Sequence, residues 1–181
     1  RELLRNEYGV LGKKVVAFIG NLLPIKNVLL LPEIFKKIKK NYDKNIVFWI
    51  IGDGNLKCEL EQLLNTKSVD YKLWGNQPSN MIPEFMNTID VLILPSKNEG
   101  LPLVTVEALA CGANVVGSNV GGISEAIGKD NSFDLDDNFI EKISNRIIEM
   151  LDNKTEQHLS DSFNWSKTAQ IENEIYLKEL N

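Results

Sequence analysis

The chain has 181 residues, of which 43% are hydrophobic and 25% are charged, a composition typical of one globular α/β domain. Its formal net charge of -5 argues against binding to nucleic acid, because affinity for phosphate backbones comes mainly from clustered lysines and arginines. The two cysteines, Cys58 and Cys111, lack the spacing of a disulfide framework or a zinc site. The sequence lacks a strand-end Asp-x-Asp motif, so we expect no metal site. No apolar run reaches the roughly 18 to 20 residues that span a bilayer, so we expect a cytoplasmic domain.

The first twelve residues differ in character from the rest of the chain. Residues 1–8 form a short, charged, helix-like piece that is closed by Gly9 and Gly12, and the sequence has no initiator methionine. We therefore expect residues 1–12 to be an inter-domain linker of a longer protein.

Beyond this segment, strand patterns and helix patterns alternate. Short β-branched or aromatic runs predict strands at 15–19, 46–51, 69–74, 91–94 and 114–117. Amphipathic segments predict helices at 28–40, 56–64, 80–87, 102–111, 123–127, 139–151 and 167–180. Most strands are apolar on both faces, whereas 69–74 alternates as an edge strand does. The order predicts a Rossmann-like, doubly wound parallel sheet over residues 13–163, followed by a C-terminal helix within 164–181.

The stretch from residue 90 to residue 112 is the most informative, because it combines a buried strand with a loop and a helix start. Pro102 suits the first turn of a helix and Gly112 suits its C-terminal cap. The backbone N–H groups of Gly100, Leu101, Leu103 and Val104 would then point out of a positively polarised helix N-terminus. We expect a pyrophosphate to bind there.

Two glutamates accompany this helix. Glu99 comes just before it, and Glu107 lies about a turn and a half inside it. Carboxylates repel phosphate, so hydroxyls are their expected targets, and a nucleotide sugar carries hydroxyls on both sides of its diphosphate. An alternative is that these acidic residues only complement the helix dipole.

The sequence Pro-Ser-Lys-Asn-Glu-Gly-Leu-Pro-Leu-Val-Thr-Val-Glu-Ala-Leu-Ala-Cys-Gly, with Glu99 and Glu107 eight positions apart, resembles the signature of the GT-B glycosyltransferases of family 4. The resemblance covers about residues 14–151. It implies that this chain is the C-terminal, donor-binding half, in which Glu99 contacts the donor sugar and Glu107 contacts the ribose.

The resemblance also assigns roles to the loops after the first and third strands. In the family the first loop holds an arginine and a lysine that neutralise the diphosphate; Lys26 matches, whereas Asn21 stands where arginine is expected. Gly75 and Asn76 match the segment whose backbone reads the base. We further expect Asn27 to cap the following helix, and Gly121 and Gly122 to make room near the sugar.

The predicted function is therefore donor binding for a retaining glycosyltransferase that moves a sugar from a UDP-, GDP- or ADP-sugar to a hydroxyl acceptor, with Glu99 and Lys26 at the reaction centre. No cofactor is expected, and the acceptor domain would precede Arg1, so the fragment alone should be inactive. The family's usual roles suggest polysaccharide or cell-envelope glycan synthesis at the inner face of a membrane. The alternatives are a degenerate nucleotide-binding or interaction module, a GT-B nucleotide-sugar epimerase or hydrolase and, ranked last because a GxGxxG turn is absent, a nicotinamide-dependent dehydrogenase.

Overall fold

A computed structural model describes residues 1–42, 44–153 and 157–158. Six parallel strands form one sheet in the order β3-β2-β1-β4-β5-β6. They are β1 (Lys14–Ile19), β2 (Ile46–Ile51), β3 (Tyr71–Gly75), β4 (Val91–Leu94), β5 (Asn114–Ser118) and β6 (Ser132–Phe133). The predicted parallel, doubly wound sheet is confirmed, with β3 at an edge, as its alternating pattern indicated.

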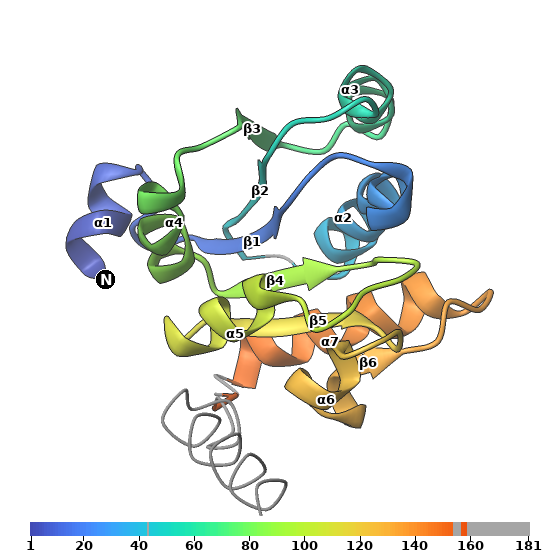
Figure 1. The fold of residues 1–181 in the computed structure, drawn as a ribbon. Coiled ribbons are helices and arrows are strands. Elements are labelled where there is room, and N and C mark those ends of the chain that lie inside the picture. Colours follow the sequence, from blue (N-terminus) through green and yellow to red (C-terminus); the bar gives the residue numbers. More distant parts are fainter. Residues whose placement is uncertain (43, 154–156, 159–181) are drawn as a thin grey trace, which may run out of the picture.

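Helices alternate with the strands along the chain and cover both faces of the sheet (Figure 1). They are α1 (Glu2–Glu7), α2 (Leu31–Asn41), α3 (Lys57–Thr66), α4 (Ile82–Thr88), α5 (Leu103–Ala110), α6 (Ile123–Ile127) and α7 (Phe139–Asn153). Short 3₁₀ turns are η1 (Pro24–Lys26), η2 (Val28–Leu30), η3 (Ser79–Met81) and η4 (Lys129–Asn131). The helix predicted at 167–180 lies outside the described residues.

Two differences from the predicted elements have local causes. The helix expected from residue 28 begins as the 3₁₀ turn η2, and α2 starts at Leu31. Asn27 occupies the N-cap position of η2, as predicted, but it adopts a left-handed conformation there and makes no capping hydrogen bond through its side chain. The two-residue strand β6 was not predicted, because so short a run carries no periodic signal.

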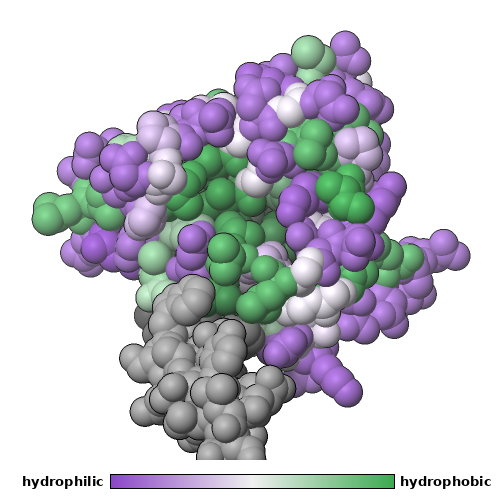
Figure 2. Space-filling model, viewed as in Figure 1, coloured by the Kyte–Doolittle hydropathy of each residue, from purple (hydrophilic) through white to green (hydrophobic). Residues whose placement is uncertain are grey.

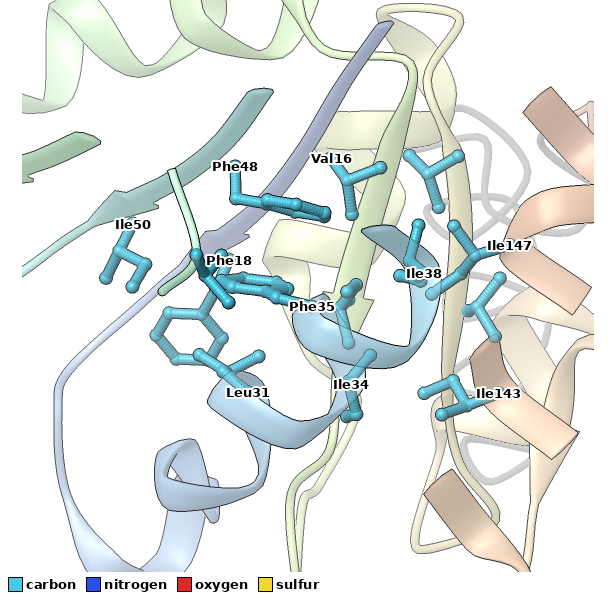
Figure 3. Packing of buried hydrophobic residues seen from close by; sticks show 14 of the residues in the cluster. Val16, Phe18, Leu31, Ile34, Phe35, Ile38, Phe48, Ile50, Ile143 and Ile147 are labelled. Carbon is cyan, nitrogen blue, oxygen red and sulfur yellow. The ribbon is translucent and has the colours of Figure 1, made fainter. Parts of the chain in front are cut away.

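The strands direct alternate side chains to two separate cores. Phe18 and Phe48 belong to the core under α2 and α7, whereas Ala17 and Trp49 belong to the core under α4 and α5. On the first face, residues of α2 spaced three or four apart are fully buried: Leu31, Ile34, Phe35 and Ile38. Figure 3 shows Leu31 beside Phe18, and Ile34 and Ile38 on the side of Ile143 and Ile147 of α7. The Phe35 and Phe48 rings stack there with centroids 4.4 Å apart.

On the other face, α1 is held against the domain at two points. Arg5 donates hydrogen bonds to the Thr88 carbonyl at 2.5 Å and to the Asp90 carboxylate at 3.3 Å. The Tyr8 ring, just after α1, packs against the rings of Trp49, Trp74 and Phe85 at centroid distances of 5.7, 5.4 and 5.2 Å. The first residues therefore pack on the sheet face that also carries α4 and α5.

Ser144 on α7 is fully buried, and its hydroxyl has no hydrogen-bond partner among the described residues. We expect Ser144→Ala to raise the free energy of unfolding by roughly 1 kcal/mol, because it removes an unsatisfied polar group and improves helix propensity. Urea denaturation would measure the change. Ser118→Ala is the contrasting variant: the Ser118 hydroxyl donates a hydrogen bond to the Ser96 carbonyl, so its removal should lower stability. A loss of stability in Ser144→Ala would contradict the expectation.

None of the helices in the described part of the chain is long and apolar enough to cross a membrane.

Candidate functional site

The site lies where the connections of the sheet change direction. Strands β1 and β4 are neighbours at its centre, but the chain runs from β1 towards β2 on one side and from β4 towards β5 on the other. At such a switch point the loops after the two strands diverge and leave a crevice at the carboxyl edge of the sheet. The fold therefore brings the loop after Ile19 next to the loop after Leu94.

An open cleft of about 340 Å³ occupies this position. Its lining residues come from the loop after β1, the start of α4 and the segment from Glu99 into α5: Ile19, Gly20, Asn21, Lys26, Ile82, Glu99, Pro102, Leu103, Val104 and Glu107. Six of the ten predicted site residues thus meet in one cleft, although Lys26 and Glu107 are far apart in the sequence. Apolar side chains with 44 to 62% of their surface exposed flank these segments: Ile25, Leu101 and Leu103.

Lys26 and Glu99 form an ion pair in this cleft. The Lys26 Nζ atom lies 2.5 Å from Glu99 Oε1, and the side chains are only 25% and 11% exposed. The same carboxylate oxygen accepts a hydrogen bond from the Ser96 hydroxyl at 2.7 Å. An ammonium has three donors, so two donors of Lys26 remain for an anionic ligand.

The loop between β5 and α6 supports the backbone around Glu99. The Gly122 N–H donates a hydrogen bond to the Gly100 carbonyl at 2.8 Å. A Cβ atom on Gly121 would lie 1.7 Å from the Glu99 carbonyl oxygen, and Gly121 has a φ of +52°. Gly121 thus makes room for the Glu99 backbone, and Gly122 makes room for Gly100 and Leu101.

Helix α5 directs its N-terminus at the cleft. Pro102 precedes the first turn and adopts an extended conformation, and the helix runs from Leu103 to Ala110. The first N–H groups of a helix have no partner within the helix, so those of Leu103 and Val104 can donate to a ligand in the cleft. Pro102 was predicted to lie in the first turn, but it occupies the N-cap position, and the helix begins one residue later than predicted.

Glu107 stands further along the exposed face of α5. Its carboxylate makes no hydrogen bond with any described residue, so its oxygens are open to a ligand.

A second hollow of about 390 Å³ between α4 and α5 adjoins the cleft and shares Ile82 and Glu107 with it. The other residues that line it are Ser79, Pro83, Met86, Ala110 and Cys111. Burial, together with the nearby Glu107 charge, raises the pKa of the Cys111 thiol and keeps it protonated at neutral pH.

Four predicted residues do not line the cleft. Gly100 and Leu101 lie beside it, at the turn that joins Glu99 to α5. Gly75 is the last residue of β3 and Asn76 follows it, at the edge of the sheet, two strands away from β1. The Gly75 carbonyl accepts a hydrogen bond from Gly52 N–H at 2.8 Å, and Asn76 is exposed.

Figure 2 shows apolar side chains gathered at the centre of the face that it presents, with polar side chains around them. Another hollow, of about 930 Å³, lies away from the cleft, at the amino ends of β1, β2 and β4. Its charged residues include Arg1, Arg5 and Asp90, which are already paired with one another. The described chain also contains no group of three or more His, Cys, Asp or Glu side chains that could hold a metal ion.

Sequence reasoning missed two serines that support the site. Ser96 and Ser118 are fully buried. The Ser96 hydroxyl donates a hydrogen bond to the Glu99 carboxylate, and the Ser118 hydroxyl donates one to the Ser96 carbonyl. Both lie at or just beyond the ends of predicted strands. A polar residue at the end of an otherwise apolar strand is the sequence feature that could have identified them. Ile82, which borders both hollows, had no such signal.

Comparison with known proteins assigns the family. The model of the family described as glycosyl transferases group 1 matches residues 1–169. The chain belongs to this family. Its members' fold is also found in solved structures: the C-terminal domain of a glycosyl transferase group 1 family protein from Francisella tularensis aligns with a TM-score of 0.70 at 21% identity, covering 85% of this chain and 84% of that one. HepE from Anabaena in complex with UDP-glucose aligns with a TM-score of 0.70 at 23% identity, covering 84% of this chain and 43% of that one.

Curated relatives are longer than this chain. An uncharacterized glycosyltransferase of Methanocaldococcus jannaschii is 28% identical over 88% of this chain and 46% of its own length. The N-acetyl-α-D-glucosaminyl L-malate synthase of Bacillus anthracis is 30% identical over 68% of this chain and 32% of its own length. The UDP-Gal:α-D-GlcNAc-diphosphoundecaprenol α-1,3-galactosyltransferase of Escherichia coli is 32% identical over 80% of this chain and 39% of its own length. This member of the family therefore spans less than half of the length of each of these relatives.

Proposed function

We propose that the chain is the donor-binding, C-terminal half of a retaining glycosyltransferase of family 4, which transfers a sugar from a nucleotide sugar to a hydroxyl acceptor. One observation carries the proposal: a single cleft holds a lysine ammonium, a helix N-terminus and two carboxylates. The positive groups suit a diphosphate, and the carboxylates suit the hydroxyls on either side of it. A nucleotide sugar has these groups in this order.

In this arrangement the diphosphate lies against Lys26 and the N–H groups of Leu103 and Val104. The ribose hydroxyls reach Glu107, the sugar hydroxyls reach Glu99, and the base lies towards the end of β3, near Gly75 and Asn76. As the bond to the sugar breaks, negative charge grows on the leaving diphosphate, and the preorganised ammonium and helix dipole stabilise that charge.

The relatives support the choice of substrate class. The Escherichia coli relative is named for UDP-galactose, and the Anabaena structure contains UDP-glucose. We propose a role in polysaccharide or cell-envelope glycan synthesis, in line with the undecaprenol-linked acceptor of the former name. The acceptor domain would belong to the part of such proteins that this chain does not span, and the chain alone should transfer no sugar.

Calorimetric titration of the chain with UDP, GDP and ADP tests donor binding. We expect one nucleotide to bind best, and Glu107→Ala to weaken it by roughly tenfold, the contribution of hydrogen bonds to a charged group. Glu141→Ala is the control, because Glu141 lies on α7, in the layer on the other face of the sheet, and pairs there with Lys37. If no nucleotide binds, the proposal fails and the degenerate module becomes the better interpretation.

The retaining mechanism needs a separate experiment on the full-length protein. Proton NMR of the first product formed from an α-linked nucleotide sugar should show an α-linked product. A β-linked first product would exclude retention, and epimerised donor formed without acceptor would indicate the epimerase instead.

A further inference from the structure

Two fully buried serines form a chain of hydrogen bonds that ends on Glu99. The Ser96 hydroxyl donates to Glu99 Oε1 at 2.7 Å, and the Ser118 hydroxyl donates to the Ser96 carbonyl oxygen at 2.5 Å. Both serines have no exposed surface. We propose that Ser96 is a positioning residue that sets the direction of the Glu99 carboxylate towards the donor sugar, and that Ser118 holds Ser96 in place. The inference rests on the proposed donor role of Glu99.

The two oxygens of the Glu99 carboxylate have different surroundings. Oε1 accepts hydrogen bonds from both Lys26 and Ser96, whereas Oε2 accepts none from the described residues. The carboxylate is thus fixed through one oxygen and presents the other. Because Glu99 lines the cleft, Oε2 is the atom that can accept a hydrogen bond from a sugar hydroxyl.

Lys26 alone would fix this geometry poorly. Its ammonium sits on a flexible four-carbon stem and can follow a moving carboxylate. Ser96 has a single side-chain torsion, and it is anchored two residues after β4 by the Ser118 hydroxyl at the end of β5. The serine therefore ties the orientation of Glu99 to the ends of the neighbouring strands β4 and β5.

Burying the Ser96 hydroxyl costs free energy that an alanine would not cost. We therefore expect the benefit of this hydroxyl in the affinity for the sugar rather than in the stability of the fold. The quantity to measure is the sugar increment, the ratio of the Kd of the free nucleotide to the Kd of its sugar ester. Titrations would use UDP, GDP and ADP with their glucose, galactose and N-acetylglucosamine esters, and the pair with the largest increment in the parent chain serves for all variants.

We expect Ser96→Ala to lower the sugar increment by up to roughly tenfold, as the loss of a hydrogen bond to a charged group does, while the Kd of the free nucleotide stays unchanged. In a Glu99→Ala background the same substitution should change nothing further. Ser118→Ala is a second variant, with a smaller loss in the same direction. Ser144→Ala is the matched control, because Ser144 is an equally buried serine on α7 without a bond to the site.

The outcomes separate the inference from the function on which it rests. The positioning role would be overturned if Ser96→Ala left the sugar increment unchanged, or lowered it equally in the parent chain and in the Glu99→Ala background. Donor binding would still stand in that case. A parent chain that binds a nucleotide but gains nothing from any of the sugars would overturn the proposed role of Glu99, and the inference with it. Thermal unfolding of each variant confirms that the comparison is made between folded proteins.

Discussion

Lys26→Ala is expected to weaken binding of the nucleoside diphosphate by about 10- to 100-fold. The reason is the loss of a charge-assisted contact of roughly 1.5 to 3 kcal/mol. The substitution also leaves Glu99, only 11% exposed, without its cationic partner, so we expect a moderate fall in the melting temperature. Calorimetry with the preferred nucleotide measures the first effect, and thermal unfolding measures the second.

The matched control is Lys142→Ala. Lys142 also pairs with a carboxylate, Asp136, but both side chains are more than 40% exposed and neither lines the cleft. Its removal should leave nucleotide affinity unchanged and cost little stability, as is usual for surface ion pairs. Equal nucleotide affinity in Lys26→Ala and Lys142→Ala would mean that Lys26 serves only to neutralise Glu99.

Gly121→Ala is expected to have the largest effect on both folding and the site. Its Cβ atom would overlap the Glu99 carbonyl oxygen at 1.7 Å, and its φ of +52° disfavours any side chain. Relief requires the Glu99 turn to move away from the β5–α6 loop. We expect a loss of roughly 2 to 4 kcal/mol in the free energy of unfolding, together with loss of the sugar increment.

Gly128→Ala separates the two causes of this loss. Gly128 has a φ of +80°, but no atom lies within 4 Å of the position of its Cβ. Its ψ of 159° places it in a backbone region that essentially only glycine adopts, so it should show that conformational cost alone, about 1 to 3 kcal/mol, and normal ligand binding. If urea denaturation gives the same loss for both variants, backbone conformation rather than contact with Glu99 explains the effect.

The sequence predicted the elements on which the site depends better than it predicted the site's internal contacts. Buried parallel strands have strong signals, so 46–51 and 91–94 were located with their observed bounds. The pairing of β1 with β4, which creates the cleft, follows from the topology rule for parallel sheets. No local pattern indicates that Lys26 and Glu99 touch across that junction, because the contact depends on two loop conformations.

The loops also explain where the predictions were less exact. Asn27 looks like a helix cap, yet it joins two 3₁₀ turns in a left-handed conformation. Gly121 and Gly122 were predicted to make room near the sugar, and the structure shows that they also make room for the backbone of residues 99–101. The residue types were informative about backbone geometry, whereas the neighbours of the two glycines are set by a segment distant in the chain.

The central pairing of β1 with β4 has a consequence for how the protein reaches its native state. It aligns Val16 with Val91 and Ala17 with Leu92, so it must close a long stretch of chain that contains β2, β3 and three helices. Contacts of such high sequence separation form slowly and late relative to local ones. Because the two halves of the cleft stand on these two strands, nucleotide affinity should emerge only once β1 and β4 have paired, and a bound nucleotide would then report that pairing.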